Sequence, residues 1–245
     1  MKNVFKFWIL LITFPVFSQQ DSGLLAVISD TNQFVLLRSG AGKENPVIDT
    51  LHEGYMFSVY GDTSKPWLDV HTPVGIAGSV HRSQVRYFDQ LDYGNQKALL
   101  LDCFHSTRIF YKDYWTRVEA AESLQKRQKL YKDANNIYEA KFIPAYTALA
   151  KLISVQPDST LLIEFYKSLP YVSGSADEGK EWACAQIWLC QTTYVESLLC
   201  NLVVSLRITV INSIKTGMAM SGFEEKFSKD DLQNKYNRLD NPCGN

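Results

Sequence analysis

The spacing of apolar residues changes near residue 90, and this change is the strongest constraint on the fold. Residues 24–88 hold short runs of β-branched and aromatic residues, with turn formers every ~8–12 residues, which is typical of a small β-barrel. From about residue 92, apolar residues recur every three or four positions, which indicates amphipathic helices. The sequence therefore predicts the α+β class, with a small β-barrel in residues 22–90 and an all-α helical domain in residues 92–240.

The first region predicts roughly five to six short strands that close into a barrel. Turns are expected at Asn32, in the Gly- and Pro-containing loop 39–46, and at residues 61–64. Alternation in residues 55–60 places Phe57 and Val59 on one face of a strand and Ser58 and Tyr60 on the other. One of these two faces must belong to the core.

The second region predicts roughly five or six helices. Pro144 should kink a helix or start it afresh, and Asp158 and Ser159 should cap the helix that follows Pro157. Ser175 with Glu178 resembles a capping box. A long helix, intact or broken, is expected over residues 176–214, and a last amphipathic helix over residues 223–237.

The first 18 residues are typical of a cleaved signal peptide. Lys2 and Lys6 precede an apolar run at residues 7–14, which is shorter than the ~20 residues that span a bilayer. Small residues near Ser18 are suited to signal peptidase, and Gln19 would begin the mature chain. The alternative is an uncleaved N-terminal anchor. We expect a periplasmic or secreted protein.

Charge and hydropathy argue against two properties of the mature chain, which are nucleic-acid binding and a transmembrane span. The formal net charge is -1, and loss of Lys2 and Lys6 takes it to about -3, so no basic footprint for nucleic acid is present. Residues 198–214 are strongly apolar, but Arg207 at their centre is costly in a bilayer. A buried bundle helix is therefore favoured over a transmembrane span.

The five cysteines do not have the spacing of a metal site. No CxxC motif occurs, and all four histidines precede Cys184. We therefore expect no metal and no cofactor. Cys184, Cys190 and Cys200 lie in an apolar stretch, which favours buried thiols over disulfide bonds, and the odd number leaves at least one thiol unpaired within the chain.

Short motifs in the strand region resemble those of the bacterial SH3-like domain. They occur in the same order as in that family, at residues 34–40 (FVLLRSG), 47–48 (VI), 51–54 (LHEG), 67–70 (WLDV) and 75–81 (GIAGSVH). The resemblance covers about a quarter of the chain, and Ser79 stands where the family usually has an aromatic residue. It implies an SH3-like barrel that binds peptidoglycan or a peptide, or that docks a neighbouring domain.

Enzymatic chemistry finds little support in the sequence. A cysteine peptidase using Cys103 would need a histidine well downstream to activate the thiol, and none follows His105. No GxSxG motif is present. A glycosidase needs two facing carboxylates, and no pair stands out among those of the helical region, which are Glu164, Asp177, Glu178, Glu181 and Glu196, although Glu164 or Glu178 is the candidate for such a role. We therefore predict no catalytic residue, with a helical muramidase-like hydrolase as the alternative.

The candidate ligand-binding residues lie in the strand region. Tyr60 and Trp67 flank the same turn, where they are placed to form an aromatic platform for a peptide or glycan. His71 and His81 lie on or near adjacent strands and complete the set as exposed histidines rather than metal ligands. The alternative is that Trp67 is the core residue of its strand.

These patterns together predict an exported, non-enzymatic binding or scaffold protein of the cell envelope. Its expected partner is peptidoglycan, a peptide or another protein. An immunity or inhibitor protein is a further alternative, because small size and export are compatible with that role.

Overall fold

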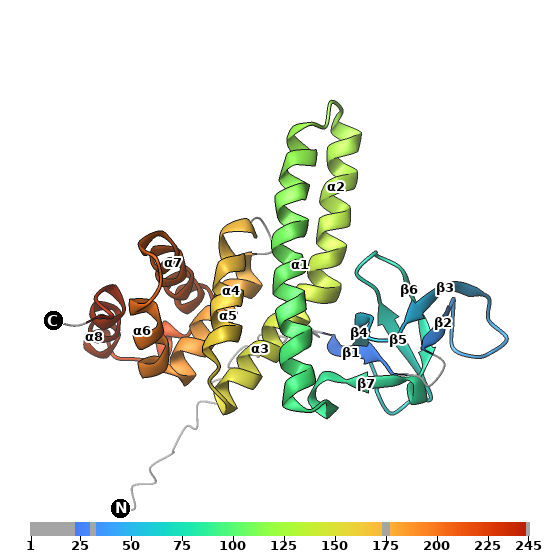
Figure 1. Ribbon diagram of the computed structural model, residues 1–245, viewed down its shortest axis with the longest axis horizontal. Helices are drawn as coiled ribbons and strands as arrows, with labels where there is room; N and C mark the ends of the chain where they lie inside the picture. Colours follow the sequence, from blue (N-terminus) through green and yellow to red (C-terminus); the bar gives the residue numbers. More distant parts are fainter. Residues whose placement is uncertain (1–22, 30–32, 173–176, 244–245) are drawn as a thin grey trace, which may run out of the picture.

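Strands form the first part of the chain and helices the rest, as Figure 1 shows for the computed structural model. The structure describes residues 23–29, 33–172 and 177–243. The predicted α+β class is confirmed. The expected signal peptide (residues 1–18) lies outside the described residues, as do Asn32 and Ser175, for which the sequence predicts a turn and a helix cap.

Seven antiparallel strands form one sheet in the described residues, where the sequence predicts five to six. Residues 47–52 and 85–87 each form a strand of their own, which accounts for the higher number. The order across the sheet is β3-β2-β6-β5-β4-β1-β7. The strands are β1 (Leu24–Ile28), β2 (Phe34–Arg38), β3 (Val47–His52), β4 (Met56–Tyr60), β5 (Trp67–His71), β6 (Ala77–His81) and β7 (Val85–Tyr87).

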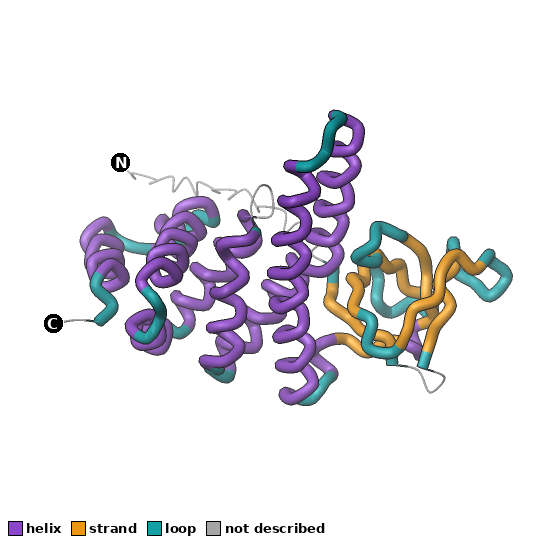
Figure 2. The backbone as a smooth tube through the Cα atoms, turned by 45° about the horizontal axis from the view of Figure 1, so that its top comes forward, coloured by secondary structure: helices purple, strands orange, loops and turns teal. Residues whose placement is uncertain are grey.

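The sheet curls around a core but does not close into a barrel. Within the described residues no ladder joins β3 to β7, so these two strands remain the edges of the sheet and the expected closure is wrong. Figure 2 shows the curl of the strands. The inner face encloses an apolar cluster, which consists of Ala26, Ile28, Val35, Leu37, Leu51, Phe57, Val59, Leu68, Val70, Val80 and Val85.

Strands β1 and β4 are buried on both faces. Ala26 and Phe57 point into the sheet's own core, whereas Leu25, Val27 and Met56 belong to the core of the helical region. Double burial explains why β1 reads LLAVI, a continuous apolar run instead of an alternating one. The two regions of the chain are therefore joined through apolar packing.

Eight α-helices follow in the described residues, more than the expected five or six. Helices α1 and α2 project as a hairpin beside the sheet, and α3 to α8 extend to the other side (Figure 1). The Asp158 carboxylate accepts a hydrogen bond from the Leu161 amide at 2.9 Å, which confirms the predicted cap. The helices are α1 (Tyr93–Glu119), α2 (Leu124–Ile137), α3 (Ile143–Val155), α4 (Ser159–Ser168), α5 (Asp177–Cys190), α6 (Thr192–Cys200), α7 (Val204–Met220) and α8 (Lys229–Asp240).

The apolar stretch of residues 176–214 is broken into α5, α6 and α7. No helix in the described ranges is long and apolar enough to cross a membrane. The expectation of a fully buried helix is only partly correct. Val210 and Ile214 of α7 are buried against its neighbours, but Val204 and Ile208 are exposed, because α7 packs through one face.

A π-helical turn connects α2 to α3 at the point where the sheet meets the helices. This turn, η3 (Tyr138–Phe142), includes a hydrogen bond from the Ile143 amide to the Tyr138 carbonyl, five residues back. In a regular α-helix the amide of residue 144 would donate to the Ala140 carbonyl, but Pro144 has no N–H. Pro144 therefore lies in the first turn of α3, so of the two alternatives that the sequence left open, a kink or a new start, the new start is correct.

The Ala140 carbonyl instead accepts a hydrogen bond from the sheet. The Ser58 hydroxyl of β4 donates to it at 2.6 Å, in a buried position 82 residues away along the chain. Ser58 has no exposed surface. A buried carbonyl that lacks a partner is costly, so this bond favours the observed docking of β4 on η3.

Ser58→Ala should therefore lower the free energy of unfolding by about 1–3 kcal/mol, because the buried Ala140 carbonyl loses this donor. Urea denaturation followed by circular dichroism measures the change. Ser79→Ala is the matched control: Ser79 is buried in the same sheet, but its hydroxyl meets only Asp69, at 3.3 Å. Equal destabilisation by the two substitutions would contradict the role given to Ser58.

Candidate functional site

A groove of about 430 Å³ crosses the outer face of the sheet over β2, β5 and β6. Its walls combine apolar, aromatic and cationic side chains. Phe34, Leu36 and Arg38 come from β2, Trp67 from β5 and His81 from the end of β6. The remaining lining residues are Lys43, Ser83 and Gln84.

Strand alternation places the β2 residues in this groove. Val35 and Leu37 point into the core, so Phe34, Leu36 and Arg38 point outward. Phe34 is 44% exposed and Leu36 is 36% exposed. Apolar side chains at solvent-facing positions of a strand leave surface that a ligand can cover, and covering it is favourable.

Trp67 and His81 form one side of the groove. They are directly opposite each other on β5 and β6, and their rings meet edge to face with centroids 5.4 Å apart. Leu68 and Val70 provide the core residues of β5. The alternative in which Trp67 is the core residue of its strand is therefore wrong.

Two cations give the groove a positive character. Lys43 lies in the loop between β2 and β3, and Arg38 lies at the end of β2. The Arg38 guanidinium donates to the Asn45 carbonyl at 2.7 Å, which ties the loop to the strand. The groove thus offers an apolar surface beside groups that attract an anion.

The four predicted ligand-binding residues share the outer face of the sheet but form two separate pairs. Trp67 and His81 line the groove, whereas Tyr60 and His71 do not. The rings of Tyr60 and His71 are 4.7 Å apart. Tyr60 lies toward the helical region: burial raises the pKa of its hydroxyl, and the Glu139 carboxylate adds to the increase.

Sequence reasoning missed Phe34, Leu36, Arg38 and Lys43. One signal was present, because FVLL in β2 is a run of four apolar residues and alternation allows only two of them to face the inner core. Lys43 offered no signal, since its place in the groove depends on how the loop folds back over β2.

Gly78 and Ser79 explain the close approach of β6 to β2. A Cβ atom on Gly78 would lie 2.5 Å from the Arg38 carbonyl oxygen, so only glycine fits at this position. Ser79 is buried and pairs with Arg38 in the ladder. Residue 79 is therefore a buried serine, and Phe34 and Trp67 supply the aromatic surface of this face.

The residues considered for catalysis lie outside this groove. Cys103 is fully buried, and desolvation raises the pKa of its thiol to about 12, so the thiol stays protonated and is a poor nucleophile. No cluster of His, Cys, Asp and Glu suited to hold a metal ion occurs among the described residues.

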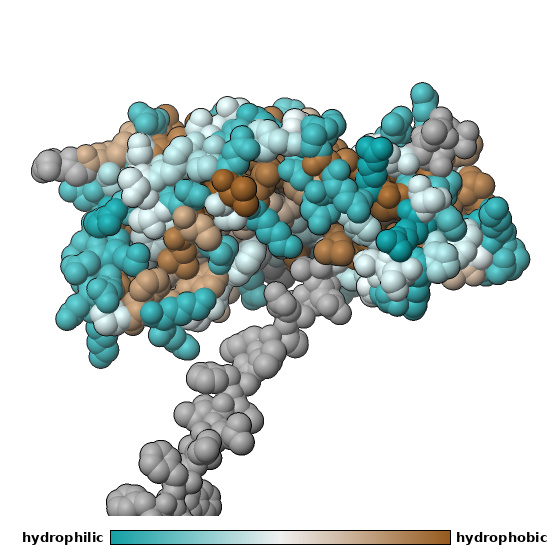
Figure 3. All heavy atoms as spheres, turned by 90° about the horizontal axis from the view of Figure 1, so that it is seen from below, coloured by the Kyte–Doolittle hydropathy of each residue, from teal (hydrophilic) through white to brown (hydrophobic). Residues whose placement is uncertain are grey.

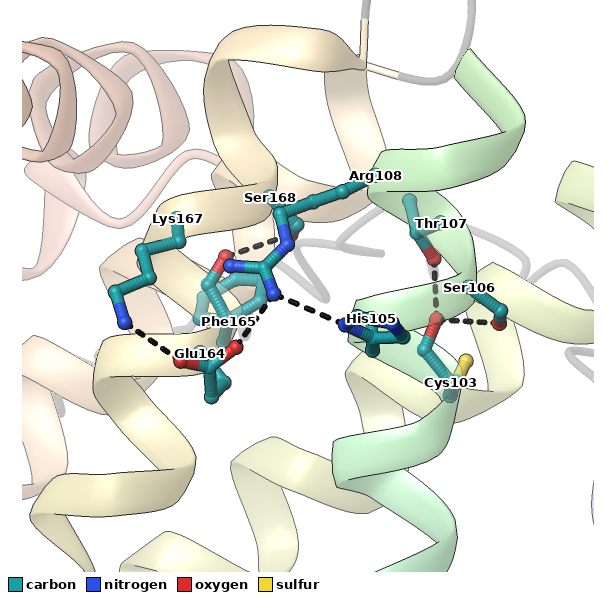
Figure 4. A network of polar contacts seen from close by, with 9 residues as sticks. All are labelled: Cys103, His105, Ser106, Thr107, Arg108, Glu164, Phe165, Lys167 and Ser168. Atoms are coloured by element: carbon teal, nitrogen blue, oxygen red, sulfur yellow. Dashed lines mark hydrogen bonds and ion pairs between the residues drawn. The ribbon is translucent and has the colours of Figure 1, made fainter. Parts of the chain in front are cut away.

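Glu164 of α4 lies between two cations, as Figure 4 shows. Its carboxylate is 2.8 Å from Arg108 of α1 and 2.7 Å from Lys167. The hydrogen bond from Lys167 and the nearby charges lower its pKa below the ordinary value of 4.5. A glycosidase acid needs a raised pKa, so the environment of Glu164 opposes that role. Glu178 is exposed in the first turn of α5.

Two other parts of the described surface offer less to a ligand than the groove does. On the face seen in Figure 3, apolar side chains form small patches separated by polar ones. A shallow hollow of about 360 Å³ lies beside Arg108, Lys112 and Lys167, but Glu164 already neutralises part of its charge. Among the residues that the structure describes, the groove on the sheet is therefore the best candidate site.

No family model matches the chain, and no curated protein is significantly similar to it.

Glu164 should make the stability of the fold depend on pH. The pKa of the carboxyl is lower in the folded than in the unfolded protein, so its contribution is present above the unfolded value and is lost as the pH falls through the folded value. At neutral pH, Glu164→Gln should reduce the free energy of unfolding by up to about 1 kcal/mol, because the ion pairs are partly exposed.

Urea denaturation of the wild type and Glu164→Gln between pH 7 and about pH 3 tests this dependence. The difference between the two proteins should shrink below about pH 4.5. Glu122→Gln, which changes an exposed carboxylate in the α1–α2 turn, should show little difference at any pH. A difference that grows on acidification would contradict the lowered pKa.

Proposed function

We propose that this chain is an exported, non-enzymatic binding protein of the cell envelope, whose SH3-like strand region holds an extended, carboxylate-bearing peptide. The groove carries this proposal, because it joins exposed apolar and aromatic side chains to two cations on one face. Stem peptides of peptidoglycan and acidic segments of proteins share the required chemistry.

The shape and composition of the groove favour a peptide over a compact ligand. Grooves lined by aromatic side chains recognise proline-rich peptides in the extended polyproline II conformation, which is largely formed before binding and so loses little conformational entropy. Phe34, Leu36 and Trp67 would contact apolar side chains or prolyl rings of such a peptide. Arg38 and Lys43 would pair with its carboxylates.

The helical region supports this role as a scaffold. It covers Met56 and Ser58 on the outer face of the sheet but leaves Trp67 and His81 open. The sheet and the helices share one apolar cluster, so the strands that form the groove belong to a packed, rigid scaffold. A hydrolase is not proposed, because the ion pairs of Glu164 oppose an acid role.

Trp67→Ala should weaken binding at least ~10-fold, because Trp67 forms one wall of the groove and aromatic anchors dominate such interfaces. Sedimentation with purified cell-wall sacculi and calorimetric titration with an acidic proline-containing peptide measure binding. Tyr131→Ala is the control, since Tyr131 is an exposed aromatic residue on α2, outside the groove. Circular dichroism verifies that both variants are folded.

The dependence of binding on salt concentration distinguishes the contribution of the cations in the groove from that of its apolar side chains. Wild-type binding to the acidic peptide should weaken as salt increases, and Lys43→Ala should reduce that dependence. If the wild type binds neither sacculi nor the peptide, or if Trp67→Ala binds as well as Tyr131→Ala, the proposed function is wrong.

A further inference from the structure

Cys200 and Cys243 meet at one point of the helical region although 43 positions separate them along the chain. Cys200 is the last residue of α6, and Cys243 follows the end of α8. An ion pair between Glu196 of α6 and Arg238 of α8 brings the two segments together, and a hydrogen bond with the Cys243 side chain raises the pKa of the Cys200 thiol. Both are free thiols in this structure.

Polar contacts within α6, and between α8 and its neighbours α6 and α7, position the segments that carry the two cysteines. The Cys200 thiol donates to the Glu196 carbonyl at 3.5 Å, and the Glu196 carboxylate forms an ion pair with Arg238 of α8 at 2.5 Å. Lys215 of α7 contacts both carboxylate oxygens of Asp240. The end of α8 is thus attached to α6 and α7 on either side of the thiols.

The surroundings of the thiols are suited to thiol–disulfide exchange. Cys243 is exposed and Cys200 is half-buried, so a reagent in solution reaches Cys243 first. The Arg207 guanidinium lies 3.3 Å from the Cys243 sulfur. A nearby positive charge stabilises the negative charge that exchange places on a sulfur atom.

The other three cysteines are placed differently. Cys103 and Cys184 are fully buried, so a reagent in solution does not reach either thiol. Cys190 is exposed at the end of α5, where its sulfur accepts a hydrogen bond from the side-chain amide of Gln186. These positions explain why only one pair of thiols is placed to react.

We propose that Cys200 and Cys243 are a disulfide site, which a low-molecular-weight disulfide such as glutathione disulfide oxidises. The Cys243 thiolate attacks one sulfur of the reagent and forms a mixed disulfide, and the first glutathione leaves as a thiol. The Cys200 thiolate then attacks the sulfur of Cys243 and releases the second glutathione. The protein loses two hydrogen atoms, and the reagent gains them as two thiols.

This bond would fasten the C-terminal helix. Closing a loop of this length restricts the unfolded chain and so stabilises the folded state. Much of the attachment of α8 is polar, through Lys215, Glu196 and Arg238, with Leu239 as its fully buried side chain. The bond would also leave Cys190 as the one exposed thiol of the chain. This inference is independent of the proposed function.

Incubation of the purified full chain with glutathione disulfide tests the proposal, followed by alkylation and peptide mapping. We expect a cross-linked peptide joining Cys200 to Cys243, an intact mass lower by two hydrogens, and a melting temperature higher by about 5 °C or more. Cys190→Ser should behave as the wild type does. Cys200→Ser should retain glutathione on Cys243 and show no such increase.

Stable glutathione on Cys243 of the wild type, or a cross-link from Cys243 to Cys190, would overturn the proposal. A cross-link between Cys200 and Cys243 without an increase in melting temperature would contradict the claim that the disulfide stabilises the attachment of α8. Both measurements use the wild type, so they remain decisive if a cysteine variant fails to fold.

Discussion

The hydrogen bond from Ser58 to the Ala140 carbonyl links the two halves of this molecule. Pro144 lacks the N–H that a regular helix would offer to this carbonyl, and the Ser58 hydroxyl fills that place from the sheet at 2.6 Å. Leu25 and Met56 lie on the same face and pack into the helical core. One polar contact and its apolar surroundings therefore determine which part of the sheet the helices cover.

The position of that contact also determines what remains exposed. The helices cover β1 and the start of β4, while β2, the start of β5 and the end of β6 stay open and carry the groove. Trp67 and His81 lie on this open part, whereas Tyr60 and His71 lie toward the helices. The outer face thus serves two purposes, which are attachment at one end and, as we propose, peptide binding at the other.

Local patterns in the sequence predicted the strands, the cap at Asp158 and a kink or new helix start at Pro144, because each depends on neighbouring residues. The unclosed sheet and the role of Ser58 depend on pairing between distant segments, which periodicity does not encode. Of the candidate site, Trp67 was predicted because it flanks a turn, and His81 because it lies on or near a strand as an exposed histidine. Phe34 and Leu36 were missed because an apolar run such as FVLL suggests core on both faces. That Cys200 and Cys243 lie near each other depends on the ion pair between Glu196 of α6 and Arg238 of α8, which joins segments far apart in the sequence.

A double-mutant cycle between Ser58→Ala and Pro144→Ala tests the central claim most directly, with the free energy of unfolding as the measured quantity. Alanine at position 144 restores an N–H that can donate to the Ala140 carbonyl, so losing the Ser58 hydroxyl should then cost less. The account predicts a coupling energy of about 0.5–3 kcal/mol between the two sites. Additive effects, within about 0.3–0.5 kcal/mol, would show that Ser58 does not substitute for the amide missing at Pro144.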